Sequence, residues 1–271
     1  MKPLLLLALF AVPLTAQGVA VAPHAVHIDS RTRSGSVELF NPSNDPVEVD
    51  VSTLFGYPVT DSAGIVRVRY FEDPDSNPAS AAGWIQAYPR RVTIPPQTRQ
   101  TLRLLVRPPA DLPDGEYWTR LVIAAEMGKV ATTGVTDSAV SIALRLRVRT
   151  IIAVTYRQGE VHTGIRMTNM RTDIDGDSLG VRVDLEREGN AAFLGTIRTV
   201  LLDAAGVEVR REDIQIAVYY DLSPRRTLSL TGLAPGSYTA ITTVDAERTD
   251  IEAALILPME PVSDTVRVEI P

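Results

Sequence analysis

Short runs in which apolar and polar residues alternate constrain this chain more than any other feature. A period of two places successive side chains on opposite faces of a β-strand. The runs are separated by clusters of Pro, Gly, Asn, Asp and Ser, as strands are in all-β proteins. Residues 19–150 contain no convincing amphipathic helix. In that part of the chain, the runs lie at residues 36–39, 47–51, 65–70, 101–106, 117–124 and 140–148.

The second half of the chain repeats the pattern. Alternating runs occur at residues 181–185, 199–202, 207–209, 238–244 and 265–270. The spacing of strands and turns is typical of Ig-like β-sandwiches. A length of 271 residues suits two such sandwiches of ordinary size. We therefore predict an all-β protein with one Ig-like domain at residues 19–150 and a second at residues 151–271.

The predicted domain boundary lacks the composition of a flexible linker. Residues 138–157 read SAVSIALRLRVRTIIAVTYR and contain neither Gly nor Pro. Flexible linkers are usually polar and rich in Gly or Ser. We therefore expect a strand to run straight from one domain into the next. Such a junction predicts a rigid, L-shaped arrangement of the two sandwiches with a cleft between them.

The first 18 residues have the layout of a secretory signal peptide. Lys2 precedes an apolar stretch at residues 4–14, and the small residues Ala16 and Gly18 follow. The apolar stretch, of roughly 12 residues, is too short to cross a hydrocarbon core of about 30 Å comfortably. We expect the mature protein to begin near residues 17–19 and to work outside the cytoplasm. The alternative is an uncleaved membrane anchor.

The composition excludes several classes of chemistry. The chain has no Cys, so it has no disulfide scaffold, no thiolate metal site and no Cys nucleophile. Three His residues leave little room for His-based catalysis or metal binding. A formal net charge of −6 gives no reason to expect nucleic acid as a partner. Mature domains without disulfides must rely on burial for their stability.

Residues 140–149 separate into two distinct faces. The even positions Val140, Ile142, Leu144, Leu146 and Val148 are apolar, and the odd positions carry Arg145, Arg147 and Arg149. One interpretation is a half-buried strand with its apolar row in its own core. The other is an edge strand that offers this row and its free backbone groups to a partner. A partner strand would then add to the sheet by β-augmentation.

Several ordered segments resemble the periplasmic pilus-assembly chaperones, the PapD-like family with two Ig-like domains. Together they cover residues 19–158, and beyond residue 160 the resemblance is only architectural. The segments are residues 19–28 with Pro23, residues 36–41 ending in Asn41, residues 85–103, the Leu-Pro turn at residues 112–117, and residues 144–157 ending in Tyr156-Arg157.

The resemblance implies a mechanism and a set of site residues. Members of this family hold a subunit whose sandwich lacks one strand, and the last strand of their first domain fills the gap. By position, the donated side chains are those of Ile142, Leu144, Leu146 and Val148. Glu116 and Arg157 match by position an inter-domain ion pair of the family, and Asp245 is a looser candidate to join them.

One departure from the family concerns the cleft. Family members commonly grip the terminal carboxylate of the subunit with an Arg and a Lys. The corresponding positions here are Ala25 and Ala153. Arg149 or Arg157 could replace this clamp in part. Otherwise the subunit is held without the clamp, or the protein is a divergent relative with another client.

Other motifs carry less weight. Asp173, Asp175 and Asp177 alternate in one loop, a spacing at which carboxylates can bind Ca²⁺. However, Gly176 does not stand at the position that an EF-hand loop requires, so a polar turn is the favoured interpretation. We expect no metal and no cofactor. No phosphate-binding loop or Gly-x-Ser-x-Gly elbow occurs, and we expect no enzyme, although a carboxylate pair brought together in space would revive a glycan hydrolase.

The leading hypothesis is therefore a periplasmic chaperone that caps pilus-type subunits by donating a strand. Its expected partners are those subunits and, as an open question, an outer-membrane usher. The chaperone itself would be a monomer or a dimer in which two donor strands pair. The alternative is a structural or adhesive Ig-like protein without chaperone activity, in which the row from Ile142 to Val148 lies in its own core.

Overall fold

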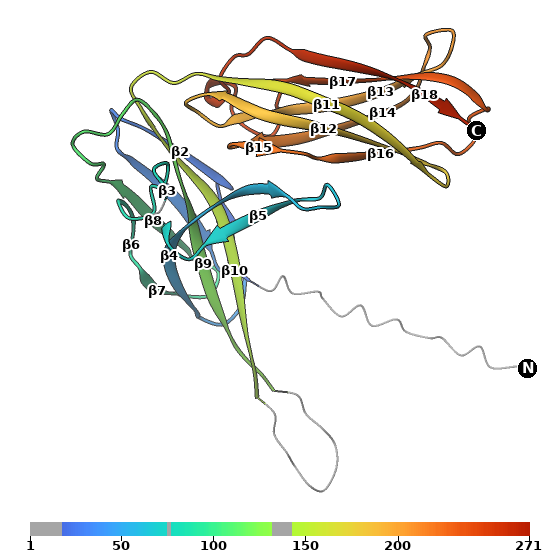
Figure 1. Cartoon of the computed structure of the whole chain (residues 1–271). Coiled ribbons are helices and arrows are strands. Elements are labelled where there is room, and N and C mark those ends of the chain that lie inside the picture. The colour runs from blue at the N-terminus through green and yellow to red at the C-terminus, as the bar shows by residue number, and fades with distance from the viewer. Residues whose placement is uncertain (1–17, 75–76, 132–142) are drawn as a thin grey trace, which may run out of the picture.

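The computed structural model describes residues 18–74, 77–131 and 143–271, and the predicted signal peptide at residues 1–18 lies almost wholly outside them. The described residues contain strands, turns and short 3₁₀ segments such as η2 (Ala253–Leu255), and no α-helix. The strands form two β-sandwiches that meet at a steep angle (Figure 1). The predicted all-β fold with two Ig-like domains is confirmed.

The first sandwich packs two sheets face to face. The first sheet has the strand order β1-β3-β8-β6, and the second has the order β2-β10-β9-β4-β5, with β7 also paired to β4. Their strands are β1 (Ala20–Ala22), β2 (Ala25–Asp29), β3 (Ser34–Phe40), β4 (Val47–Thr60), β5 (Val66–Phe71), β6 (Ile85–Tyr88), β7 (Arg91–Ile94), β8 (Arg99–Val106), β9 (Gly115–Ala131) and β10 (Ala143–Gln158).

The alternation in the sequence decides which face of each strand is buried. In β8, Leu102, Leu104 and Val106 point into the core, whereas Arg103 and Leu105 point to solvent. The same period in the other strands gathers one continuous apolar core between the two sheets. Removal of these side chains from water is the main stabilising term for a domain without disulfides.

The first two strands lie in different sheets although only Pro23 and His24 separate them. β1 pairs with β3 in one sheet, and β2 pairs in parallel with β10 in the other. The chain therefore crosses the edge of the sandwich at Pro23. As a result, β2 covers only the last part of β10, from Ala153 to Arg157.

The second sandwich has its own two sheets. One has the order β11-β12-β15, with β16 also paired to β12, and the other has the order β14-β13-β17-β18. Two buried apolar clusters fill the space between the sheets. The strands are β11 (Thr163–Asp175), β12 (Ser178–Gly189), β13 (Phe193–Leu202), β14 (Glu208–Val218), β15 (Asp221–Leu222), β16 (Arg225–Ser229), β17 (Gly236–Asp245) and β18 (Val262–Ile270).

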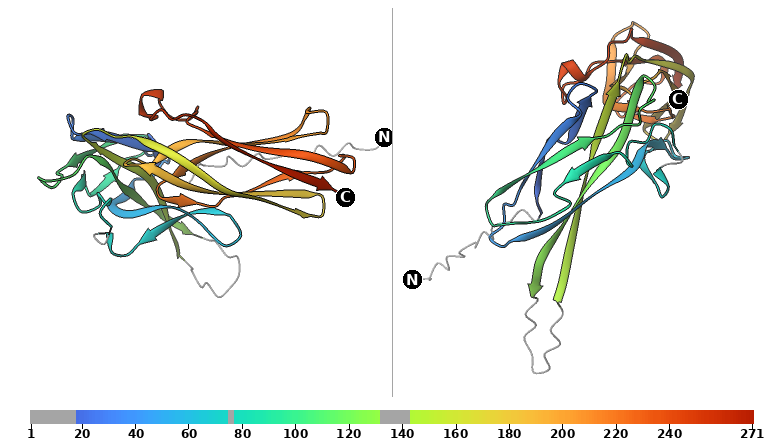
Figure 2. Two further views of the ribbon diagram at one scale, coloured as in Figure 1. Left: turned by 45° about the horizontal axis from the view of Figure 1, so that its top comes forward. Right: turned by 90° about the vertical axis from the view of Figure 1, so that its left-hand side faces the viewer.

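The domains join where β10 ends. β10 stays paired with β9 as far as Gln158, so the boundary predicted at residues 150/151 falls inside this strand. The next strand, β11, begins at Thr163 in the second sandwich. The views in Figure 2 show the long β9–β10 pair leading from the domain junction to the opposite end of the first sandwich.

Candidate functional site

β10 has a free edge over most of its length. It pairs with β9 from Ala143 to Gln158, but β2 lies along its other side only from Ala153 to Arg157. Between Ala143 and Ile152, no strand of the described ranges pairs with that second side. This gap follows from the sheet switch at Pro23, which sends the preceding residues to the opposite sheet. The outward N–H and C=O groups of this segment are available for a further strand.

The apolar row of β10 runs from the core to the surface. Tyr156, Val154 and Ile152 are buried in the first sandwich. Farther along the same face, Val148 is half-buried and Leu146 is 36% exposed. The buried residues lie beyond the predicted row, whose described side chains, those of Leu146 and Val148, are exposed or half-buried rather than in the core.

The two remaining members of the predicted donor row are less fully described. Ile142 lies outside the described residues. Leu144 pairs with Val130 of β9, and the register shifts between Leu144 and Leu146, as at a β-bulge. β4 pairs with β9 only up to Glu126, so the two strands continue past the sheet as a two-stranded ribbon (Figure 1).

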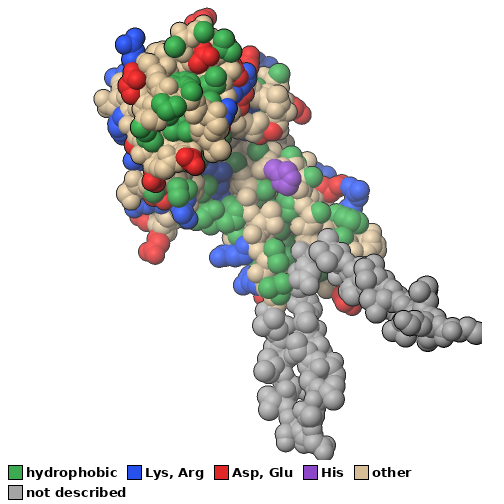
Figure 3. Space-filling model, turned by 90° about the vertical axis from the view of Figure 1, so that its right-hand side faces the viewer, with side chains coloured by type: hydrophobic (Ala, Val, Ile, Leu, Met, Phe, Trp, Pro, Cys, Tyr) green, Lys and Arg blue, Asp and Glu red, His purple; other side chains and the backbone are tan. Residues whose placement is uncertain are grey.

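The opposite face of β10 is polar. Arg147 forms an ion pair with Asp50 at 3.1 Å, and Asp50 also binds Arg91 at 2.6 Å. Arg149, a predicted cleft residue, is exposed and pairs with Ala124 in the middle of the sheet. Eight strand residues, about 26 Å, separate it from Arg157. Arg149 therefore does not belong to the domain junction. Figure 3 shows Lys and Arg side chains beside exposed hydrophobic ones on one face of the first domain.

The predicted pair Glu116 and Arg157 does lie at the domain junction. The two residues are opposite each other on β9 and β10, and Arg157 Nε donates to Glu116 Oε2 at 2.8 Å. Glu116 Oε1 accepts hydrogen bonds from Trp118 Nε1 at 2.7 Å and from the backbone N–H of Ala192 at 3.2 Å. Arg157 Nη2 donates to the backbone carbonyl of Leu255 at 2.8 Å. The pair thus binds the second domain on two sides.

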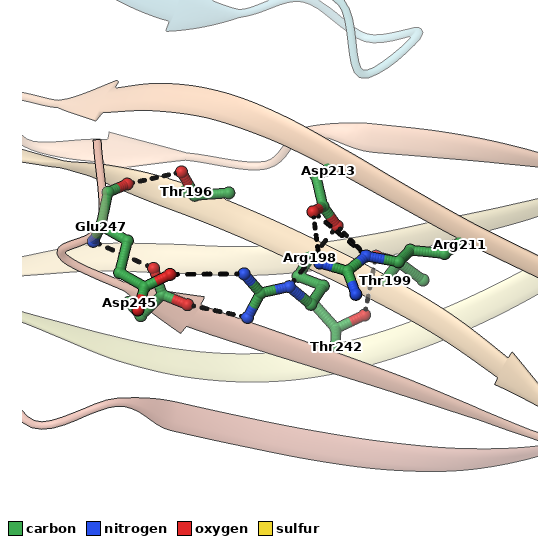
Figure 4. A network of polar contacts seen from close by, with 8 residues as sticks. All are labelled: Thr196, Arg198, Thr199, Arg211, Asp213, Thr242, Asp245 and Glu247. Carbon is green, nitrogen blue, oxygen red and sulfur yellow. Dashed lines mark hydrogen bonds and ion pairs between the residues drawn. The ribbon is translucent and has the colours of Figure 1, made fainter. Parts of the chain in front are cut away.

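Asp245 does not join this pair, contrary to the expectation from the sequence. Its carboxylate binds Arg198 Nη1 at 3.1 Å and accepts from the backbone N–H of Glu247 at 3.0 Å. Figure 4 shows this network, in which Arg198 also approaches Asp213. Asp245 ends β17, a strand whose register with β13 keeps it inside the second sandwich. The spacing in the sequence carried no information about that register.

An aromatic cluster at the junction was missed in the sequence. Trp118 packs edge-on against Tyr219 with ring centroids 4.7 Å apart, and Tyr57 contacts Tyr220 at 4.9 Å. Tyr220 also donates a hydrogen bond to Asn77 Oδ1 at 3.0 Å. The adjacent tyrosines at the end of β14 were the available signal, because two large rings beside a turn rarely stay exposed without a partner.

A groove of about 760 Å³ lies between the domains. Its walls come from β2 and from the segment that precedes and includes η2, with Ala25, His27, Arg248 and Glu252 among them. Ala25 and Ala153 are direct neighbours in the parallel β2–β10 pair. The two positions of the expected clamp are therefore adjacent, and neither carries a charged side chain. Burial lowers the pKa of His27, whose buried Nδ1 has no hydrogen-bond partner among the residues that the structure describes.

The three loop carboxylates do not gather around a common point. Asp173 pairs with Arg225 at 2.5 Å, and Asp175 pairs with Ser178 at the tip of the β11–β12 hairpin. In the described ranges, no group of three or more His, Asp or Glu side chains is arranged to hold a metal ion. Residues 176 and 177 form the turn of this hairpin. Nor does any helical segment of these ranges have the length and hydropathy of a membrane span.

Comparisons with known proteins find similarity in structure only. No family model and no curated protein sequence matches the chain. The class 5 fimbriae chaperone CfaA is 12% identical over 92% of this chain and 98% of its own, with a TM-score of 0.46. A chain from Salmonella enterica SafA pilin in complex with the SafB chaperone is 16% identical over 92% of this chain and 96% of its own, with a TM-score of 0.43. The Pseudomonas aeruginosa CupB2 chaperone is 12% identical over 91% and 98%, with a TM-score of 0.42.

Proposed function

We propose that this protein is a periplasmic chaperone that binds pilus-type subunits by adding the free edge of β10 to an incomplete Ig-like sandwich. The observation that carries the proposal is the free side of β10 between Ala143 and Ile152. A long strand edge without a partner promotes aggregation unless a partner covers it. Backbone hydrogen bonds along this edge would supply affinity, and the row of Leu146 and Val148 would set the register.

The energetics favour a strand partner over a loose apolar contact. Burial of a fully exposed Leu or Val side chain is worth about 1.5–3 kcal/mol before the costs of association are subtracted. Leu146 exposes only 36% of its surface and Val148 is already half-buried, so each contributes a fraction of this value. Two side chains alone therefore give weak binding. Strong binding requires the backbone groups of the whole edge segment to pair as well. This requirement selects a client that lacks a strand rather than a folded protein with a flat surface.

A charge on the apolar row tests the proposal. We expect Leu146→Glu to abolish copurification with a pilus-type subunit co-expressed in the periplasm, because a carboxylate cannot enter an apolar groove unpaired. The variant itself should stay folded, with a free energy of unfolding within about 0.5 kcal/mol of the wild type. Size-exclusion chromatography of the complex and urea unfolding of the isolated variant measure the two effects.

Leu105→Glu is the matched control. Leu105 is a strand leucine of the same domain that is 39% exposed, and it lies on the outer face of the opposite sheet. It should retain normal copurification. If Leu146→Glu copurifies as well as this control, strand donation by β10 is wrong.

The alternative function is that of a structural or adhesive Ig-like protein. In that case the exposed end of the row would be covered by the protein's own chain, and Leu146→Glu would unfold the first domain. A dimer in which two β10 edges pair is the third arrangement to be distinguished. It predicts a concentration-dependent mass that falls to the monomer value when Leu146 is replaced by Glu.

A further inference from the structure

One side of the second sandwich is open. β14 and β16 are both edge strands, and they face each other across this side without pairing. Arg210 bridges the opening at one end, where its guanidinium donates to the carbonyls of Ser229 and Thr231 at 2.8 and 2.6 Å. We call the space between β14 and β16 beyond this bridge the seam.

The seam leads into a cavity of about 680 Å³, a size within the ordinary range for ligand pockets. Ile214 and Ile216 of β14 form one wall. Ile65, from the turn between β4 and β5 in the first domain, and Val66, at the start of β5, form another. Ile65 is 51% exposed, so this apolar wall is reached from solvent.

A buried charge without a partner lines this cavity. Arg226 is only 7% exposed, yet its Nε and Nη2 donate no hydrogen bond within the described part of the chain. Across the seam, Glu212 also holds a buried carboxylate oxygen, Oε2, without a partner. The two side chains form no ion pair with each other. Burial lowers the pKa of Arg226, and the charge of Glu212 opposes that shift. Buried polar groups are normally satisfied, so these two call for an explanation.

The chemistry of the seam selects its occupant. A purely apolar molecule would leave Arg226 and Glu212 unsatisfied, and an anion bound to Arg226 would be repelled by the nearby carboxylate. A peptide group has both an acceptor for Arg226 and a donor for Glu212, and it carries no net charge. Some backbone groups of these edges are already bonded: the N–H of Arg225 donates to Gly64, and the carbonyl of Ile216 accepts from Arg248. An extended peptide has backbone groups that match the remaining free groups of β14 and β16.

We propose that the seam between β14 and β16 binds an extended peptide segment of a partner protein, with apolar side chains in the cavity and a backbone amide between Arg226 and Glu212. The site is separate from the β10 edge and does not rest on the function proposed for that edge. It makes the second domain a binding module in its own right.

The test uses a phage library of random heptapeptides, selected on the purified protein and analysed by amide chemical shifts in NMR. We expect enrichment of peptides with alternating apolar residues that perturb the amides of β14 and β16. Their affinity should fall about tenfold or more in Arg226→Met, which keeps the length of the side chain and removes its donors. Leu146→Glu should leave their affinity unchanged, because it alters only the β10 edge.

Stability provides the second readout. Arg226→Met removes buried donors without a partner, and Glu212→Leu removes a buried acceptor without one. The double variant should therefore raise the midpoint of thermal unfolding by about 2–4 °C. A gain in stability together with a loss of peptide binding is the signature of a binding group. The proposal is overturned if no peptide is enriched, or if the enriched peptides bind Arg226→Met and Leu146→Glu equally. It is also overturned if a fatty acid such as decanoate occupies the cavity and peptides do not.

Discussion

At the scale of single residues, Glu116 shows how one carboxylate can join two domains. It accepts hydrogen bonds from Arg157, from Trp118 and from the backbone of Ala192, and only 2% of its side chain is exposed. Removal of one member of such a buried pair leaves the other charge uncompensated. The loss of unfolding free energy then exceeds the net contribution that the intact pair makes to stability.

We therefore expect Glu116→Gln to lower the free energy of unfolding by about 3–5 kcal/mol, because it leaves the Arg157 guanidinium without its counter-charge. Urea unfolding followed by fluorescence measures this change. Glu38→Gln is the matched control, since Glu38 pairs with Arg99 at the surface and its loss should cost about 0–1 kcal/mol. Equal effects of the two variants would contradict the role assigned to Glu116.

His27, in the wall of the inter-domain groove, makes the stability of the protein depend on pH. Burial lowers the pKa of His27 in the folded protein, so the unfolded chain binds its proton at a higher pH, near 6.5. The contribution of this histidine to stability is therefore present above about pH 6.5 and is lost as the pH falls below it. Thermal unfolding between pH 7.5 and 5.5 should show this decline, and His27→Gln should flatten it. His24→Gln, at an exposed position, should keep the wild-type profile. A flattened profile in that variant would contradict the assignment of the pH dependence to His27.

At the scale of elements, β10 has two environments along one strand. From Ala153 to Arg157 it is central, with β2 and β9 on its two sides. From Ala143 to Ile152, β9 is its only paired neighbour among the described strands. The alternation in the sequence predicts which face of the strand is apolar. It does not predict which edge is free, because that depends on the sheet switch at Pro23.

Hydrogen exchange of individual amides measures this difference. Between Arg145 and Ile152, we expect alternate amides to exchange rapidly, since antiparallel pairing with β9 protects only every second one. From Ala153 to Arg157, we expect all backbone amides to be protected, because β9 and β2 pair with the two sides of the strand. A bound subunit should slow exchange only at the rapidly exchanging amides between Arg145 and Ile152. Uniform protection along the whole strand in the isolated monomer would show that the edge is already covered.

At the scale of the whole molecule, the junction makes the two sandwiches one body. The ion pair of Glu116 and Arg157 lies beside the packing of Trp118 against Tyr219. The turn between β4 and β5 adds a backbone hydrogen bond from Arg225 to Gly64 at 3.0 Å. An interface of this kind couples the stabilities of the domains.

We expect the wild-type protein to unfold in a single calorimetric transition, as domains with a strongly coupled interface do. Trp118→Ala removes a buried aromatic side chain at the junction, at a cost of about 3–5 kcal/mol, and should split the transition in two. Differential scanning calorimetry resolves the two cases. Two separate transitions in the wild type, or an unsplit transition in the variant, would contradict the coupling. Leu105→Glu, which is remote from the junction, should keep a single transition.

The sequence predicts the two sandwiches and the core faces well, because the side-chain period of a strand is local information. It also brings Glu116 and Arg157 together through the resemblance to pilus-assembly chaperones. It fails for Asp245 and Arg149, since their neighbours are set by strand register over long separations in the chain. The cluster of Trp118 and Tyr219 was missed for the same reason.

The continuity of β10 has a mechanical consequence. The strand that would carry a bound subunit at Leu146 is the same strand whose Arg157 is fastened to the second domain at Leu255. Any pull on the subunit along the strand axis would load the bonds to β9 and β2 in shear. These bonds would share the force rather than break one after another, so the protein would resist tension along β10 far better than peeling from its free end.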